Sequence, residues 1–249
     1  MTKVFVHGNP ETSAIWTPLV AALSARGVND VVLLSPPGFG ASVPQGWTAT
    51  VQEYRNWLVH ELENIGGEID LVGHDWGAGH VFSVLAHRPD LVRSWAADCV
   101  GLLHPDYVWH DAAQGWQTPE VGEQIVAAML AMEEDVFADS FVQLGMTEAI
   151  AREVKAAITE DMGACVLGLY RDAAQPAMSR LGERLIVHRP PRGMVIVAED
   201  DHYAGTVPMM EEMAEVLQAD IATMARCGHW WMIQNPDAAA DYLVGHWSR

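Results

Sequence analysis

Asp75 is the residue of this sequence whose setting best suits covalent chemistry. It lies between Gly73 and Gly77, after the apolar, strand-like segment 69–72 and before a segment with helical periodicity. A glycine on each side permits a turn so sharp that a side chain at either position would clash, and the side chain at the tip projects over the end of a sheet. A carboxylate there is ionised at neutral pH and can displace a leaving group from an alkyl carbon. An aspartate that only caps a helix would have the same local sequence.

The segments around this turn predict a parallel sheet covered by helices. Short apolar runs alternate with segments of helical periodicity, which is typical of repeated strand–helix units. The alternation stops between about 102 and 172, where the pattern is helical. We therefore predict an α/β fold whose core consists of residues 1–101 and 176–249, with an inserted helical cap at 102–175. The predicted strands lie at 4–6, 31–34, 69–72, 92–99, 194–197 and 221–224, and predicted core helices lie at 13–25, 50–64, 208–217 and from Pro236 onward.

The composition excludes some classes of partner. The 249 residues include 14 Lys and Arg against 33 Asp and Glu, which gives a net charge of −19 at neutral pH. Such a charge argues against nucleic acid and against an anionic membrane surface. The three cysteines, Cys99, Cys165 and Cys227, are widely spaced and predict ordinary buried thiols in a reducing compartment. No signal peptide or membrane-spanning stretch is recognisable, so the expected location is the cytoplasm.

Five short motifs follow one another along the chain in an order that a known family shares. They are residues 7–10 (HGNP), 37–42 (PGFGAS), 73–77 (GHDWG), 198–201 (AEDD) and 227–230 (CGHW). On these motifs the chain resembles the α/β-hydrolase superfamily, specifically the branch with an aspartate nucleophile that contains epoxide hydrolases and haloalkane dehalogenases. The resemblance covers nearly the whole chain. It implies an α/β-hydrolase fold, a mostly parallel sheet flanked by helices with an inserted helical cap.

The resemblance also implies a role for each of five residues. Asp75 attacks the electrophilic carbon and forms an alkyl ester. His229 takes a proton from the water that hydrolyses this ester, and Asp201 orients the histidine and compensates its charge. The backbone N–H groups of Asn9 and Trp76 are the candidate donors to the oxyanion of the second step. We expect no metal and no cofactor, because no pattern of histidines, cysteines or carboxylates has metal-ligand spacing.

Other residues could share or replace these roles. Asp98 follows a predicted strand, and some relatives carry the acid of the triad at that place, so Asp98 is the rival of Asp201. Cys227 is explained better by packing in the core than as a thiol nucleophile. The remaining histidines, such as His7 and His74, are expected to orient loops or to fill polar niches.

The markers of substrate class are divided. Asn9 and Trp76 match the residues with which dehalogenases solvate a departing halide. Tyr170 lies late in the predicted cap, in a Tyr-Arg segment that resembles one bearing an acid tyrosine of epoxide hydrolases. The loops 198–201 and 227–230 also look closer to epoxide hydrolases. The balance favours an epoxide hydrolase that converts an epoxide to a vicinal diol, with a haloalkane dehalogenase as the alternative. A non-catalytic protein of the same fold that binds a small molecule is the second alternative.

The first motif begins almost at Met1, whereas members of the resembled family usually have two further strands before it. The strand at 31–34 would then lie at an edge of the sheet, and such edges are usually covered or paired. A second copy of the chain could cover this edge. The expected partners are therefore a small hydrophobic substrate and, in a homodimer, a second copy.

Overall fold

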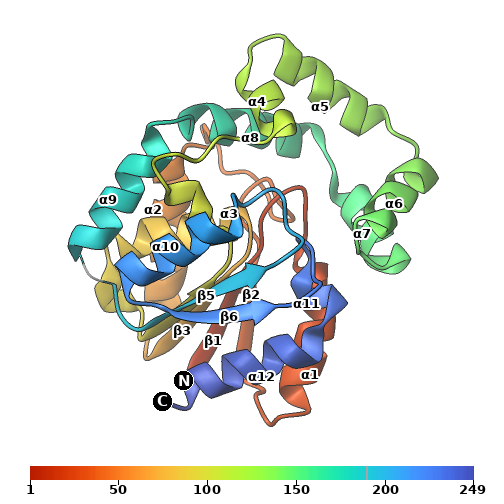
Figure 1. The fold of residues 1–249 in the computed structure, drawn as a ribbon. Coiled ribbons are helices and arrows are strands. Elements are labelled where there is room, and N and C mark those ends of the chain that lie inside the picture. The colour runs from red at the N-terminus through yellow and green to blue at the C-terminus, as the bar shows by residue number, and fades with distance from the viewer. Residues whose placement is uncertain (189) are drawn as a thin grey trace.

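The computed structural model describes residues 1–188 and 190–249 (Figure 1). Its centre is a six-stranded sheet in the order β2-β1-β3-β4-β5-β6, and every neighbouring pair of strands is parallel. The predicted α/β class and parallel sheet are therefore confirmed. The strands are β1 (Thr2–Val6), β2 (Val31–Leu34), β3 (Ile69–Gly73), β4 (Ser94–Ala97), β5 (Gly193–Ala198) and β6 (Asp220–Met224).

Helices cover both faces of this sheet (Figure 1). The core helices are α1 (Thr17–Ser24), α2 (Val51–Ile65), α3 (Trp76–Leu85), α9 (Ala177–His188), α10 (Val207–Leu217), α11 (Trp231–Gln234) and α12 (Pro236–Trp247). Three short 3₁₀ helices accompany them: η1 (Ser13–Trp16), η2 (Pro89–Leu91) and η3 (Val100–Leu103). One hydrophobic cluster packs α2, α3, α9 and α10 on one face, and a second cluster packs α1 and α12 on the other.

The central strands β1, β3, β4 and β5 are buried on both faces, which explains the short apolar runs that predicted them. In β1, Val4 and Val6 belong to the first cluster and Phe5 to the second, and all three side chains are fully buried. In β3, Leu71 belongs to the first cluster and Val72 to the second. Successive side chains of a strand point to opposite faces, so a strand between two helical layers needs apolar residues at every position.

Local capping sets where several helices begin. The Thr50 side chain accepts a hydrogen bond from the Glu53 N–H at 3.2 Å, and the Glu53 carboxylate accepts one from the Thr50 N–H at 3.1 Å. This capping box starts α2 where the sequence predicted. The helix predicted at 13–25 is instead divided into η1 and α1. The Thr12 hydroxyl caps η1, and Pro18 occupies the first turn of α1, where its missing N–H costs nothing.

Five helices are inserted between β4 and β5, within the range predicted as a cap. They are α4 (Asp111–Gln117), α5 (Val121–Ala131), α6 (Glu134–Gln143), α7 (Glu148–Ala157) and α8 (Glu160–Asp172). Figure 1 shows them above and to the right of the sheet, where α6 and α7 form a group separate from α4 and α5. The division into a core and a cap at 102–175 stays a prediction, and its first boundary falls inside η3.

The strand β2 lies at an edge of the sheet, as the sequence predicted. It is only partly buried, and Leu33 is 37% exposed. A homodimer across this edge remains a prediction. Among the described residues, no helix combines the length and the apolar character needed to cross a membrane.

Candidate active site

Asp75 occupies the sharp turn that the sequence predicted. It joins β3 to α3 with φ 52° and ψ −122°, a backbone conformation that residues with a side chain rarely adopt. A Cβ at Gly77 would lie 2.0 Å from the Val6 carbonyl oxygen, and a Cβ at Gly73 would lie 2.7 Å from the Ala78 Cα. Only glycine fits at these two positions. The turn therefore holds Asp75 at the carboxyl end of a central strand.

The loop after β1 orients the Asp75 carboxylate. Its Oδ1 accepts a hydrogen bond of 2.9 Å from the Asn9 backbone N–H. Gly8 permits this approach, because a Cβ there would lie 2.1 Å from Oδ1. Burial raises the pKa of Asp75 to about 6, although the charge of His229 and the Asn9 N–H both favour the ionised form. The N–H of Trp76, at the first position of α3, has no acceptor in the described part of the chain.

The structure brings His229 and Asp201 together beside Asp75. The Nδ1 of His229 lies 2.8 Å from Oδ2 of Asp201, and its Nε2 lies 3.8 Å from Oδ2 of Asp75. The other oxygen of Asp201 accepts the Tyr203 N–H at 2.8 Å, which fixes the carboxylate. Burial would lower the pKa of His229, but the charge of Asp201 outweighs it and the pKa rises to about 9. Two carboxylates thus flank one imidazolium in the resting site.

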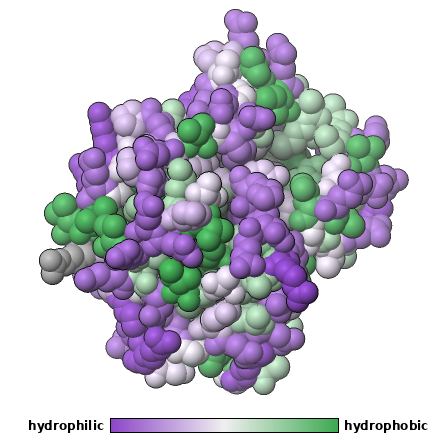
Figure 2. Space-filling model, viewed as in Figure 1, coloured by the Kyte–Doolittle hydropathy of each residue, from purple (hydrophilic) through white to green (hydrophobic). Residues whose placement is uncertain are grey.

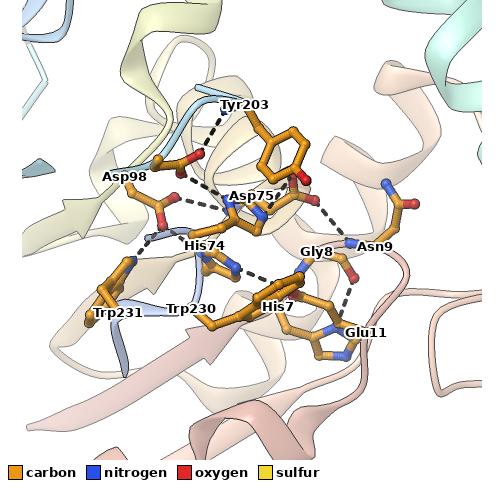
Figure 3. A network of polar contacts seen from close by, with 12 residues as sticks. His7, Gly8, Asn9, Glu11, His74, Asp75, Asp98, Tyr203, Trp230 and Trp231 are labelled. Atoms are coloured by element: carbon orange, nitrogen blue, oxygen red, sulfur yellow. Dashed lines mark hydrogen bonds and ion pairs between the residues drawn. The ribbon is translucent and has the colours of Figure 1, made fainter. Parts of the chain in front are cut away.

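A second buried histidine, His74, lies between two carboxylates of its own (Figure 3). Its Nδ1 contacts Asp98, and its Nε2 lies 3.1 Å from Oε1 of Glu11. Burial opposes protonation, but these two carboxylates outweigh it and hold the pKa of His74 well above its ordinary value. The indole of Trp231 donates to Asp98 at 2.7 Å, and the indole of Trp230 donates to Glu11. The sequence reasoning missed Glu11, although an acidic residue in the loop directly after a central strand is a signal that could have found it.

This second network stands directly behind the first. The rings of His74 and His229 have centroids 4.5 Å apart. The positive charge of His74 opposes protonation of His229 and favours ionisation of Asp75. Asp98, the rival acid, contacts His74 and accepts the Asp75 N–H at 3.0 Å. The structure therefore pairs His229 with Asp201, and it places Asp98 where it supports the turn.

Tyr170 reaches the site from α8. Its hydroxyl accepts a hydrogen bond of 3.3 Å from the Asn9 side-chain amide. Burial and the nearby charge of Asp75 raise the pKa of Tyr170, whereas the hydrogen bond from Asn9 acts in the opposite direction. The rings of Tyr170 and Trp76 meet edge to face with centroids 5.3 Å apart. The side chains of Asn9 and Trp76 thus both contact Tyr170, the first through its amide and the second through its ring.

A cavity of about 350 Å³ opens from this point under the inserted helices. Its polar end is formed by Asp75, Asn9, Tyr170 and His229. Figure 2 shows hydrophobic residues around a hollow on the same side of the molecule as α5 and α6. The apolar part of the lining consists of Pro10, Ala112, Trp116, Ile125, Ala128, Met129, Met132, Phe137, Phe141, Leu144 and Trp230. Such a cavity suits a small apolar molecule that presents one reactive carbon to Asp75.

Two groups of buried side chains have ligand atoms close enough together to hold a metal ion: Glu11, His74 and His229, and Cys99, Asp201 and His229. In both groups, most of these atoms already serve in the hydrogen bonds described above. Burial and nearby carboxylates also raise the pKa of Cys99, which disfavours the thiolate that a metal would need. Hydrogen bonding between neighbours explains these groups without an ion.

A known protein family and several known proteins are similar to this chain in sequence. A family profile described as "Alpha/beta hydrolase family" matches residues 4–242. A haloalkane dehalogenase of Mesorhizobium japonicum is 23% identical over 216 residues, which are 82% of this chain and 64% of that protein. A haloalkane dehalogenase of Bradyrhizobium diazoefficiens is 31% identical over 112 residues, 43% of this chain and 34% of that protein. The matches thus span less than two thirds of the length of either relative.

Solved structures resemble this one over nearly the whole chain. A loop variant of a haloalkane dehalogenase from Bradyrhizobium elkanii superposes with a TM-score of 0.76 at 19% identity, over 99% of this chain and 90% of that one. A thermophilic esterase from Thermogutta terrifontis superposes with a TM-score of 0.75 at 17% identity, over 100% of this chain and 89% of the esterase chain. At such identities the likeness establishes the fold alone, and the chemistry must be argued from the site.

Proposed function

This chain belongs to the alpha/beta hydrolase family, and from that premise we propose that it hydrolyses carbon–halogen bonds through an ester on Asp75, as a haloalkane dehalogenase. Two curated sequence relatives bear that name. One arrangement carries the proposal: the Asn9 N–H holds Oδ1 of Asp75 at 2.9 Å, while Nε2 of His229 lies 3.8 Å from Oδ2. A nucleophile, a base and a donor for the oxyanion thus meet at the polar end of a largely apolar cavity.

In the first step, Oδ2 of Asp75 attacks the carbon that bears the halogen. A carbon–oxygen bond forms as the carbon–halogen bond breaks, and the halide leaves with the bonding electrons. The side-chain amide of Asn9, which lines the cavity together with Asp75, supplies one hydrogen bond for the developing anion, and the indole of Trp76, which packs against Tyr170, is the proposed second donor. A halide is a weak base, so it needs these hydrogen bonds but no proton.

The second step depends on a change in the charge state of the site. In the free enzyme the ionised Asp75 helps to keep His229 protonated, with a pKa of about 9. Ester formation removes this negative charge, so the pKa of His229 falls, the imidazolium releases its proton to solvent, and the neutral imidazole can take a proton from the attacking water. The water attacks the ester carbon, and the N–H groups of Asn9 and Trp76 hold the oxyanion. On collapse the alkoxide leaves and takes the proton that His229 gained from water, which gives the alcohol and leaves the water oxygen in the Asp75 carboxylate.

The sequence alone favoured an epoxide hydrolase, and the named relatives favour the haloalkane alternative instead. Epoxide opening is the second candidate because of one observation, the Tyr170 hydroxyl in the same cavity as Asp75. A phenol there could protonate the alkoxide, which is far more basic than a halide. A protein that only binds a small molecule has no need of a nucleophile, a base and an acid in contact.

A panel of 1-chloroalkanes, 1-bromoalkanes and terminal epoxides tests this assignment when both halide and diol are measured. We expect halide release from the haloalkanes, and its loss in Asp75→Asn. Tyr170→Phe serves as the matched variant: it should leave halide release nearly unchanged, whereas an epoxide hydrolase would lose about 10²–10⁴-fold. Diol formation without halide release would assign the epoxide reaction, and no product from either class would refute both.

A further inference from the structure

A second pocket, of about 360 Å³, lies between α2, α3 and α9 and shares no lining residue with the active-site cavity. Three of its lining residues are arginines: Arg55 from α2, and Arg180 and Arg184 from α9. His87, which follows α3, lies among them. Figure 1 shows these helices side by side, away from the α6–α7 group. We name this feature the arginine pocket.

Among the described residues, the three arginines of this pocket have no acidic partner. The arginines that do form ion pairs with carboxylates are Arg26, Arg88, Arg93, Arg152, Arg171 and Arg249. Within residues 1–188 and 190–249, no carboxylate makes an ion pair with Arg55, Arg180 or Arg184. The chain carries 33 acidic residues against 14 basic ones, so carboxylates are abundant. Two further arginines in the described part of the chain also lack such a pair, so it is the grouping of these three in one pocket that needs an explanation.

His87 brings two of these cations together. Its Nδ1 lies 2.9 Å from the Ser83 carbonyl oxygen, so Nδ1 carries the proton and Nε2 is a bare acceptor. Nη1 of Arg55 and Nη1 of Arg184 both donate to that Nε2, at 3.1 Å and 2.9 Å. Burial and the two arginines lower the pKa of His87, which keeps the ring neutral. Two guanidinium groups thus converge on a partner that compensates neither charge.

The carboxylate on the wall of this pocket does not compensate them either. Asp172, at the end of α8, accepts the Val51 N–H at 2.8 Å and so caps the start of α2. Arg55 makes its other side-chain contact with the neutral amide of Asn56. Burial, and after it the like charge of Arg184, lower the pKa of Arg55, so the two guanidinium groups repel each other across their shared contact. An anion between the two guanidinium groups would relieve this repulsion.

We propose that the arginine pocket binds a small organic anion through its carboxylate or phosphate group. Guanidinium groups present paired N–H donors that match the oxygens of both groups, and such charge-assisted hydrogen bonds are stronger than neutral ones. Arg55 and Arg184 hold the anionic group in place of their shared contact with His87. The apolar side chains of Met178 and Leu181, which line the same pocket, lie against the body of the molecule. This site is independent of the reaction at Asp75.

Calorimetric titration with four probes tests the site and identifies the anionic group. Inorganic phosphate and phenyl phosphate form one pair, acetate and benzoate the other, each at an ionic strength held constant with sodium chloride. We expect saturable binding of at least one pair, with the aromatic member tighter because it buries apolar surface. The double variant Arg55→Gln, Arg184→Gln should weaken binding about tenfold or more, since each lost contact is charge-assisted.

Arg226→Gln is the matched control, because it removes the same charge from an exposed arginine outside the pocket. It should bind the probes as the unmodified protein does. Equal binding by the double variant, or no saturable binding of any probe, would overturn the proposal.

A second measurement needs no variant and so does not depend on the folding of one. Phenylglyoxal modifies accessible arginines, and peptide mass spectrometry gives the rate at each residue. The probe that binds should slow the modification of Arg55 and Arg184 and leave Arg226 unchanged. Equal slowing of all three arginines, or of none, would contradict a specific site.

Discussion

Replacing Asp201 with asparagine should stall the second half of the reaction and spare the first. Oδ2 of Asp201 lies 2.8 Å from Nδ1 of His229, and Oδ1 accepts the Tyr203 N–H at 2.8 Å. In Asp201→Asn the amide oxygen can keep the contact with Tyr203, which turns the amide NH₂ toward Nδ1. The imidazole must then accept at Nδ1 and carry its proton on Nε2. In that tautomer it cannot take a proton from water.

The expected loss is large and confined to one step. Substituting the amide for the orienting carboxylate of a catalytic triad lowers kcat by about 10⁴-fold, which corresponds to about 5 kcal/mol in the barrier. Ester formation should keep nearly its normal rate, because Asp75 attacks without a base. The variant should therefore release about one halide per enzyme molecule and then stop.

Rapid-quench measurement of halide, together with the intact mass of the protein, checks this expectation. The mass should rise by one alkyl group and remain raised after the burst. Asp200→Asn is the control, because Asp200 is an exposed carboxylate in the same loop; it should turn over normally. Sustained turnover by Asp201→Asn would show that another group, with Asp98 as the obvious one, orients His229. Loss of the burst itself would show that Asp201 is also needed for the attack by Asp75, and it would refute the expectation that only the second step is impaired.

Three further changes probe the same site. Ester formation in single-turnover experiments should fall about tenfold per pH unit below about 6, because burial raises the pKa of Asp75 to about 6 and only the carboxylate attacks; a rate constant down to about pH 4 contradicts this. Gly8→Ala should abolish the halide burst, because its Cβ would lie 2.1 Å from Oδ1 of Asp75; an unchanged burst refutes the close approach. Glu11→Gln should lower the free energy of unfolding in urea at neutral pH by about 3 kcal/mol, since it leaves the buried His74 with a single carboxylate. The charge of His74 outweighs burial and lowers the pKa of Glu11 to about 2, so the carboxylate stabilises the fold above its ordinary pKa and this contribution disappears as the pH falls toward about 2. A stability difference that persists at low pH would contradict the ion-pair explanation.

The sequence could predict the sheet and the turn because both are local patterns. Each central strand is a short apolar run, and the spacing of the two glycines around Asp75 is a local pattern, although the contact that requires Gly77 is with the neighbouring strand β1. The contact between His229 and Asp201 was predicted in another way, from the order of motifs that the chain shares with a family. Both residues follow strands at the same end of a parallel sheet, so the fold brings them together.

Other features depend on contacts that no local pattern encodes. Glu11, His74 and Asp98 come from three loops, and each residue alone looks like an ordinary polar loop residue. Their role as an ion-pair network depends on burial, because a buried imidazolium must have compensating carboxylates. The arginine pocket joins residues from α2 and α9, which are far apart in the sequence. The helix predicted at 13–25 was divided for a local reason, since Thr12 and Pro18 impose two separate starts.

The most direct test of a covalent ester on Asp75 is a single turnover in water enriched in oxygen-18, with enzyme in excess over a haloalkane. The water oxygen should enter the carboxylate of Asp75, and the alcohol should carry the unlabelled oxygen that Asp75 supplied. Mass spectrometry of the peptide that contains Asp75 measures the first, and mass spectrometry of the alcohol measures the second. Label in the peptide and not in the alcohol is the predicted result. Label in the alcohol after one turnover would mean that water attacks the substrate directly, and it would contradict the mechanism.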